Sequence, residues 1–126
     1  MNIVLWVVQV LLALMFLFHG RTMFSPPNPM PENMAKGMRY VVDLPPGLRR
    51  FIGICEILGG VGMILPALSG ILPWLTPLAA AGLALIMLLA AGFHLPRREY
   101  PNMVFNVILL ALAAFVAYGR FVITPL

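Results

Sequence analysis

The sequence predicts an all-α integral membrane protein, a four-helix bundle with a short amphipathic helix in its first loop, formed by residues 1–126 as a single domain. The first observation behind this fold class is composition: 62% of the residues are hydrophobic and only 10% are charged, whereas soluble domains contain about 25% charged residues. The second is the length of the stretches without charge, which suits membrane-spanning helices. The composition also excludes a disordered chain, which would be poor in large apolar residues.

The charge-free stretches comprise residues 1–20, 57–96 and 100–119. A helix needs about 20 apolar residues to cross the hydrocarbon core, so the stretches correspond to one, two and one spans. Proline and glycine cluster near the centre of the long stretch, which predicts a turn there. In lipid, a helix is the structure that satisfies all backbone hydrogen-bonding groups within such a segment. We therefore expect four helices, over residues 2–20, 48–66, 74–94 and 102–122.

The first helix is expected to stay in the protein and not to be cleaved as a signal peptide. It has no basic segment in front of the apolar stretch and no small-x-small cleavage site. It is also longer than the hydrophobic core of a signal peptide, which spans about 7–15 residues.

Basic residues define the expected orientation. All Lys and Arg residues except Arg120 belong to the first and third loops or their flanks, and such residues concentrate in cytoplasmic loops. We expect a multi-pass protein of a bacterial inner membrane, with both termini outside and loops 21–47 and 95–101 cytoplasmic. Trp6 and Trp74 then both fall at the outer interface, where indole rings are favoured. The positive charge therefore indicates topology and contact with membrane lipids, not nucleic-acid binding.

The first loop contains the predicted surface helix, over about residues 32–43. Its apolar residues follow helical spacing: Met34, Met38, Val41 and Val42. Two opposite-charge pairs stand four residues apart, Glu32–Lys36 and Arg39–Asp43, and such pairs support a helix. An amphipathic helix of this kind either connects two spans along the membrane surface or docks a partner protein.

Glu56 is the main candidate for a functional residue. A charge near the bilayer centre costs about 3 kcal/mol or more, so intramembrane carboxylates usually face the bundle interior. Arg49, Gly53, Glu56 and Gly60 form one stripe of the second predicted helix. Because glycine permits close approach, this stripe either packs tightly against a neighbour or leaves room for a ligand head. The adjacent Cys55 is expected to be a small buried apolar residue.

Further polar residues are expected to reach the same cytoplasmic-side pocket, whereas the outer half offers few comparable side chains. Arg49 shares the stripe of Glu56, and the others come from the remaining helices: His19, His94, Asn102, Asn106 and Gln9. Polar groups that converge in an apolar pocket are typical of a ligand site. The alternative roles are helix capping for the residues at helix ends and interhelical hydrogen bonding for the others.

We expect neither catalytic residues nor a metal site. A two-histidine, one-carboxylate site would need His19, Glu56 and His94 to converge from three helices. A haem between the two histidines is disfavoured, because both are expected at the membrane interface. The nine methionines are interpreted as packing residues.

Several segments resemble the DoxX-like membrane family in register. The clearest is LRRFIGICEILGGVGMILP (48–66), and the resemblance continues through FHGRTMF (18–24), PENMAKGM (31–38), AAAGLALIMLLAAGFHLPRRE (79–99) and NVILLALAAFVAYGR (106–120). The resemblance implies a four-helix membrane bundle in which Glu56, His94 and Asn106 occupy positions of the family pattern. Relatives include a subunit of an archaeal thiosulfate:quinone oxidoreductase, members of thiol and oxidative-stress complexes, and receptor assembly factors in animals. The cysteine pairs of some redox-linked relatives are absent here.

Three classes of function remain open. The first is a non-catalytic accessory or anchor subunit, at most part of a membrane oxidoreductase, that binds a quinone, a lipid or another hydrophobic molecule around Glu56. Its partner would be a soluble or membrane redox protein. The second is a membrane assembly or scaffolding factor that acts through protein–protein contacts. The third, a small-molecule transporter, is disfavoured because the chain has no detectable inverted repeat and few pore-lining charges. Helices rich in Ala and Gly also favour a homo-oligomer.

Overall fold

The computed structural model describes all 126 residues. It contains α1 (Asn2–Phe24), α2 (Glu32–Gly37), α3 (Tyr40–Asp43), α4 (Pro46–Ser69), α5 (Leu75–His94) and α6 (Tyr100–Tyr118), followed by a π-helical turn, η1 (Gly119–Ile123). Four of these segments are long and apolar enough to cross a membrane: α1, α4, α5, and α6 together with η1. The predicted all-α membrane bundle is therefore confirmed.

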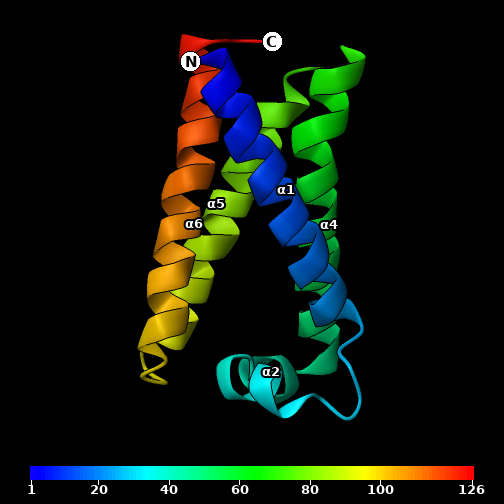
Figure 1. Ribbon diagram of the computed structural model, residues 1–126, viewed down its shortest axis with the longest axis vertical. Helices are drawn as coiled ribbons and strands as arrows, with labels where there is room; N and C mark the ends of the chain where they lie inside the picture. Colours follow the sequence, from blue (N-terminus) through cyan, green and yellow to red (C-terminus); the bar gives the residue numbers. More distant parts are fainter.

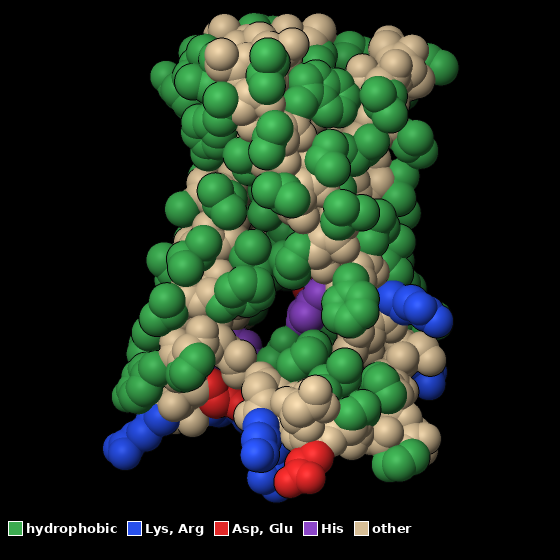
Figure 2. All heavy atoms as spheres, viewed as in Figure 1, with side chains coloured by type: hydrophobic (Ala, Val, Ile, Leu, Met, Phe, Trp, Pro, Cys, Tyr) green, Lys and Arg blue, Asp and Glu red, His purple; other side chains and the backbone are tan.

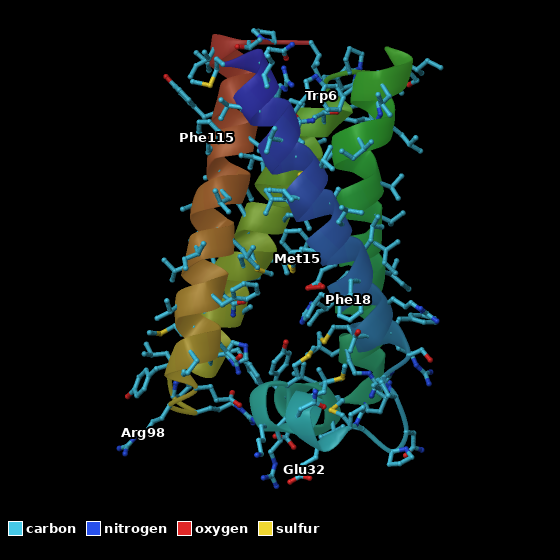
Figure 3. The ribbon with its side chains drawn as sticks, in the orientation of Figure 1. Trp6, Met15, Phe18, Glu32, Arg98 and Phe115 are labelled. Carbon is cyan, nitrogen blue, oxygen red and sulfur yellow. The ribbon has the colours of Figure 1, made fainter.

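The four long helices form two pairs that diverge along the bundle. α1 packs along α4 and α5 packs along α6, and the pairs lie close where the chain termini meet (Figure 1). At the other end they separate, and the short helices α2 and α3 lie across the opening. We call these the termini end and the loop end. In Figure 3, Trp6 lies near the termini end, whereas Glu32 and Arg98 lie at the loop end.

Glycines of the predicted stripe bring α1 and α4 into backbone contact. A Cβ atom added to Gly53 would lie 2.6 Å from the carbonyl oxygen of Gly20, and one added to Gly20 would lie 2.8 Å from that of Gly53. A Cβ on Gly60 would meet the carbonyl oxygen of Ala13 at 3.2 Å. Of the two interpretations of the stripe, tight packing against a neighbour is therefore the one observed at the glycines, as in other small-residue interfaces.

Other glycines of α4 face α5, close to the termini end. A Cβ on Gly62 would lie 2.9 Å from the Cβ of Ala79. The carbonyl of Gly62 loses its usual intrahelical donor, because the residue four positions later is Pro66. The hydroxyl of Thr76, at the start of α5, donates to this carbonyl at 3.3 Å. α4 therefore passes through Pro66 and ends at Ser69, one turn later than predicted, where Gly70 adopts a left-handed conformation with φ of 72°.

The first helix is also longer than predicted. α1 ends at Phe24, so His19 lies inside the helix and not at its end. The last turn of a helix leaves carbonyl oxygens without intrahelical donors. The Nε of Arg49 donates to one of them, the carbonyl oxygen of Met23, at 2.7 Å. This contact from α4 stabilises the additional turn of α1.

The surface helix differs from the prediction in two ways. It is divided into α2 and α3 at Met38 and Arg39. Neither predicted opposite-charge pair forms. Asp43 instead accepts a hydrogen bond from Arg97 at 2.6 Å. Val41 is fully buried beneath the bundle opening. Contacts with the α5–α6 loop therefore position this segment, rather than charge pairs within one helix.

Candidate functional site

An apolar cavity of about 350 Å³ opens where α4 and α5 diverge at the loop end. Twelve of its 16 lining residues are hydrophobic, and α3 covers it with Tyr40. The space-filling view shows a hollow in the lower half of the molecule with histidine side chains at its edge (Figure 2). Volumes of about 300–1,000 Å³ with mostly apolar walls are typical of small-molecule sites. We call this the loop-end cavity.

Four of the predicted site residues line the loop-end cavity, from four different elements. They are His19 of α1, Glu56 of α4, His94 of α5 and Asn106 of α6. Cys55 also lines it and is only partly buried, so the expectation of a fully buried cysteine is wrong. Four of the seven predicted polar side chains therefore converge in the wall of one apolar cavity.

Glu56 begins a hydrogen-bonded chain that crosses from α4 to α3. Its side chain is only 1% exposed, and its Oε2 lies 2.7 Å from Nδ1 of His19. The other ring nitrogen of His19, Nε2, lies 2.6 Å from the hydroxyl of Tyr40. With a neutral imidazole, Nδ1–H donates to the carboxylate and Nε2 accepts from the phenol. Burial raises the pKa of Tyr40, and the nearby charge of Glu56 raises it further, so the phenol keeps its proton.

A second polar chain leads from the cavity to the surface of the loop end. Nδ1 of His94 lies 2.9 Å from Oε1 of Glu99, and the Nε of Arg97 donates to the same oxygen at 2.6 Å. The hydrogen bond from Arg97, followed by that from His94, holds the pKa of Glu99 below its usual range. Arg97 also binds Asp43 of α3. Tyr40 stands edge-on to His94 with ring centroids 4.8 Å apart, which places it between the two chains.

Asn106 contributes a buried donor that the protein itself leaves unused. Its Nδ2 is buried and has no hydrogen-bond partner. Asn102, one turn earlier in α6, does not reach the loop-end cavity and lines only a small adjoining cavity of about 30 Å³ between α1 and α6. Unpaired buried donors are rare in native proteins because their desolvation is not compensated. Asn106 lines both cavities, and its buried amide nitrogen is without a partner in the protein.

Besides Asn102, two other predicted site residues lie outside this cavity, Arg49 and Gln9. The Nε of Arg49 is engaged with the α1 carbonyl described above, so Arg49 supports the helix pair. Gln9 lies nearer the termini end, where its Nε2 donates to the carbonyl oxygen of Met63 at 2.9 Å. Its Oε1 accepts from the Nε of Arg120 at 2.6 Å. Gln9 was expected to reach the pocket around Glu56, but it lies ten residues before His19 on α1, which runs antiparallel to α4, and therefore meets Met63 instead.

Sequence reasoning missed two features. Tyr40 was not predicted as a site residue, because it was part of the surface helix and only the tertiary contact with His19 reveals its role. The half with the chain termini, expected to be the outer one, was expected to offer few comparable polar side chains, yet Arg120 is 2% exposed inside the bundle there. The single basic residue on that side was the available signal, and it was interpreted only as a topology marker.

The residues considered for a metal site do not form one. His19 and Glu56 are in contact, but His94 pairs with Glu99. No three His, Cys, Asp or Glu side chains come together in an arrangement that could hold a metal ion.

The sequence model of the DoxX-like family matches residues 7–116, which is most of the chain. The chain belongs to the DoxX-like family. This match spans α4 and α5 completely and most of α1 and α6, and it includes Glu56, His19, His94 and Asn106. No curated protein and no solved structure matches the chain. The family assignment therefore agrees with the four apolar helices in supporting a multi-pass membrane protein.

Proposed function

We propose that this DoxX-like protein is a non-catalytic membrane subunit that binds a quinone, or a similar hydrophobic molecule with a polar head, in the loop-end cavity. The observation that carries the proposal is the unpaired Nδ2 of Asn106 in the wall of an apolar cavity of about 350 Å³. Binding sites of this kind combine apolar walls with a few polar groups that orient the ligand.

The polar groups suit a ligand with oxygen atoms on a flat ring. Asn106 supplies an N–H donor for a carbonyl oxygen. Nδ1 of His94 is engaged with Glu99, so in the neutral imidazole Nε2 is an acceptor for a hydroxyl group. A quinone offers a carbonyl and its reduced form offers a hydroxyl, so both forms find a partner. Glu56 and His19 extend the polar surface beside this position.

The route to the cavity favours a ligand that arrives from the bilayer. Phe51 of α4 and Leu89 of α5 line the cavity and also have side chains that are more than half exposed on the outside of the bundle. In a membrane these side chains contact acyl chains. A hydrophobic molecule can therefore enter between α4 and α5 without crossing water.

The loop end supplies the surface for a redox partner. In the orientation proposed from the basic residues, it faces the cytoplasm of a bacterial cell. The chain Asp43–Arg97–Glu99–His94 connects its surface to the cavity wall. A soluble or membrane partner docked there would lie next to the polar head of the bound molecule.

Asn106→Leu is the sharpest test, because it removes the unused donor without breaking a hydrogen bond within the protein. A structural role predicts unchanged or greater stability, since an unpaired polar group is removed. The ligand role predicts weaker binding of a short-chain quinone to the purified protein in detergent, measured by calorimetry. One lost hydrogen bond is worth about 0.5–1.5 kcal/mol, so we expect the Kd to rise by about two- to tenfold.

Two further variants serve as a control and as a second test of the proposal. Asn102→Leu is the matched control, because Asn102 lies on the same helix but lines only the smaller cavity; its Kd should equal that of the wild type. Glu56→Gln keeps the shape of the side chain but removes its charge, and should reduce the quinone that co-purifies. Unchanged binding in both Asn106→Leu and Glu56→Gln refutes the proposal. A protein partner that is retained through residues 21–47, without any ligand, would instead support the assembly-factor role.

A further inference from the structure

Arg120 is a buried cation without a counter-charge. It lies in the π-helical turn that follows α6 and its side chain is 2% exposed. The chain has four acidic residues, and Arg120 forms an ion pair with none of them. Charges buried in proteins are normally paired, because removing them from water costs several kcal/mol. The guanidinium lies over the ring of Trp6, 5.5 Å from its centroid, but the termini end supplies no side-chain anion to balance its charge.

The partners of Arg120 use only part of its hydrogen-bonding capacity. Its Nε donates to Gln9, and its Nη1 donates to the side chain of Asn2 at 2.8 Å and to the carbonyl oxygen of Thr124 at 3.2 Å. A guanidinium has five N–H donors, and these contacts account for three. The remaining two belong to Nη2, which is buried and has no partner. All three contacts are to neutral oxygen atoms, which orient the guanidinium but leave its charge unbalanced.

The local backbone and a second cavity point to a ligand at this position. π-Helical turns occur frequently at functional sites, and here the turn places Arg120 inside the bundle. Arg120 lines a cavity of about 240 Å³ together with residues of the α4–α5 turn, of α5 and of the C-terminal segment: Pro73, Trp74, Pro77, Phe121, Pro125 and Leu126. The indole of Trp74 is 55% exposed, and the cavity lies at the end of the bundle where the membrane interface is expected. Arg120 has the only charged side chain among the lining residues, which also include Leu126, the last residue of the sequence.

We propose that Arg120 and this cavity bind a phosphate oxyanion, with the apolar walls contacting the organic part of the molecule that carries it. A guanidinium is well suited to phosphate because it donates several charge-assisted hydrogen bonds. The two sources of this group at a membrane interface are an anionic phospholipid headgroup and a free phosphate. This site is separate from the loop-end cavity, which lies at the opposite end of the bundle.

Melting of the purified protein in a neutral detergent distinguishes the sources. Phosphatidylglycerol, phosphatidylcholine and inorganic phosphate are titrated separately at constant ionic strength. We expect phosphatidylglycerol to raise the Tm at lower concentrations than the zwitterionic phosphatidylcholine does. A rise with inorganic phosphate alone assigns the site to the free ion. No rise with phosphatidylglycerol or with phosphate overturns the proposal.

The same titrations on variants locate the effect. Arg120→Gln should increase the phosphatidylglycerol concentration needed for half of the Tm shift at least tenfold. Arg98→Gln, which removes a positive charge at the loop end, should leave it unchanged. Trp74→Ala retains every hydrogen bond of Arg120 and should weaken binding of the lipid but not of phosphate. If Arg120→Gln does not fold, Trp74→Ala decides, and an unchanged lipid response in that variant overturns the proposal.

Discussion

Replacing Gly53 with alanine tests both the α1–α4 contact and its connection to the site. The added Cβ would lie 2.6 Å from the carbonyl oxygen of Gly20 and 2.9 Å from the backbone nitrogen of Phe24. Both are backbone atoms of α1, so no flexible side chain can move aside. The helices must separate instead.

The expected magnitude follows from two opposing effects. Overpacking a well-packed interface costs about 1–3 kcal/mol, whereas alanine in place of glycine favours a helix by about 1 kcal/mol. The contacts below 3 Å to rigid backbone place the cost in the upper part of its range. We therefore expect Gly53→Ala to lower the free energy of unfolding by about 1–2 kcal/mol.

The site should respond to the same substitution. Gly20 adjoins His19, and Gly53 lies one turn before Glu56 on the same helix. Separation of the two helices at this point lengthens the 2.7 Å contact between His19 and Glu56. Quinone binding should weaken together with the loss of stability, although Gly53 does not line the cavity.

Unfolding in mixed micelles with increasing sodium dodecyl sulfate, followed by circular dichroism, measures the effect. Gly82→Ala on α5 is the matched control, because an added Cβ there meets nothing within 4 Å. This control should be stabilised by up to about 1 kcal/mol through its helix propensity. If Gly53→Ala is stabilised as much as Gly82→Ala, the reasoning about the glycine contact is refuted.

Three further predictions concern the loop end. The phenol of Tyr40 should ionise at a higher pH than free tyrosine, because burial raises its pKa; ultraviolet titration should show a late-ionising component that disappears in Tyr40→Phe. The pKa of Glu99 is lowered from 4.5 in the folded protein, so its contribution to stability is present above about pH 4.5 and is lost as the pH falls through the lowered folded-state pKa. Acid titration of the Tm should therefore show a smaller decrease in Glu99→Gln than in the wild type, and equal decreases would contradict this assignment. The third prediction uses cysteines introduced at Ser25 and Ser69 in a Cys55→Ala background. Membrane-impermeant reagents should label them from opposite sides of the membrane, because these residues end α1 and α4 at opposite ends of the bundle. Labelling of both from the same side would contradict four spans.

The spans could be predicted because hydrocarbon imposes a local rule on sequence. A segment that crosses lipid must be long, apolar and helical, and each condition can be read from consecutive residues. The turn near Gly70 was predicted for the same reason, since glycine and proline act on the local backbone. The helix ends were less predictable. The additional turns of α1 and α4 depend on donors from other helices, Arg49 and Thr76.

The sequence by itself determined which polar side chains need partners inside the bundle, because a carboxylate such as Glu56 is costly in lipid wherever its helix packs. Only the tertiary structure decided which of them meet. The antiparallel packing of α1 along α4 brings Gln9 beside Met63 and Arg120, whereas His19, ten residues later on the same helix, meets Glu56. It also divides the polar residues between two ends of the bundle. Crossing angles arise from the fit of whole helix surfaces, so no single residue of the sequence reveals them.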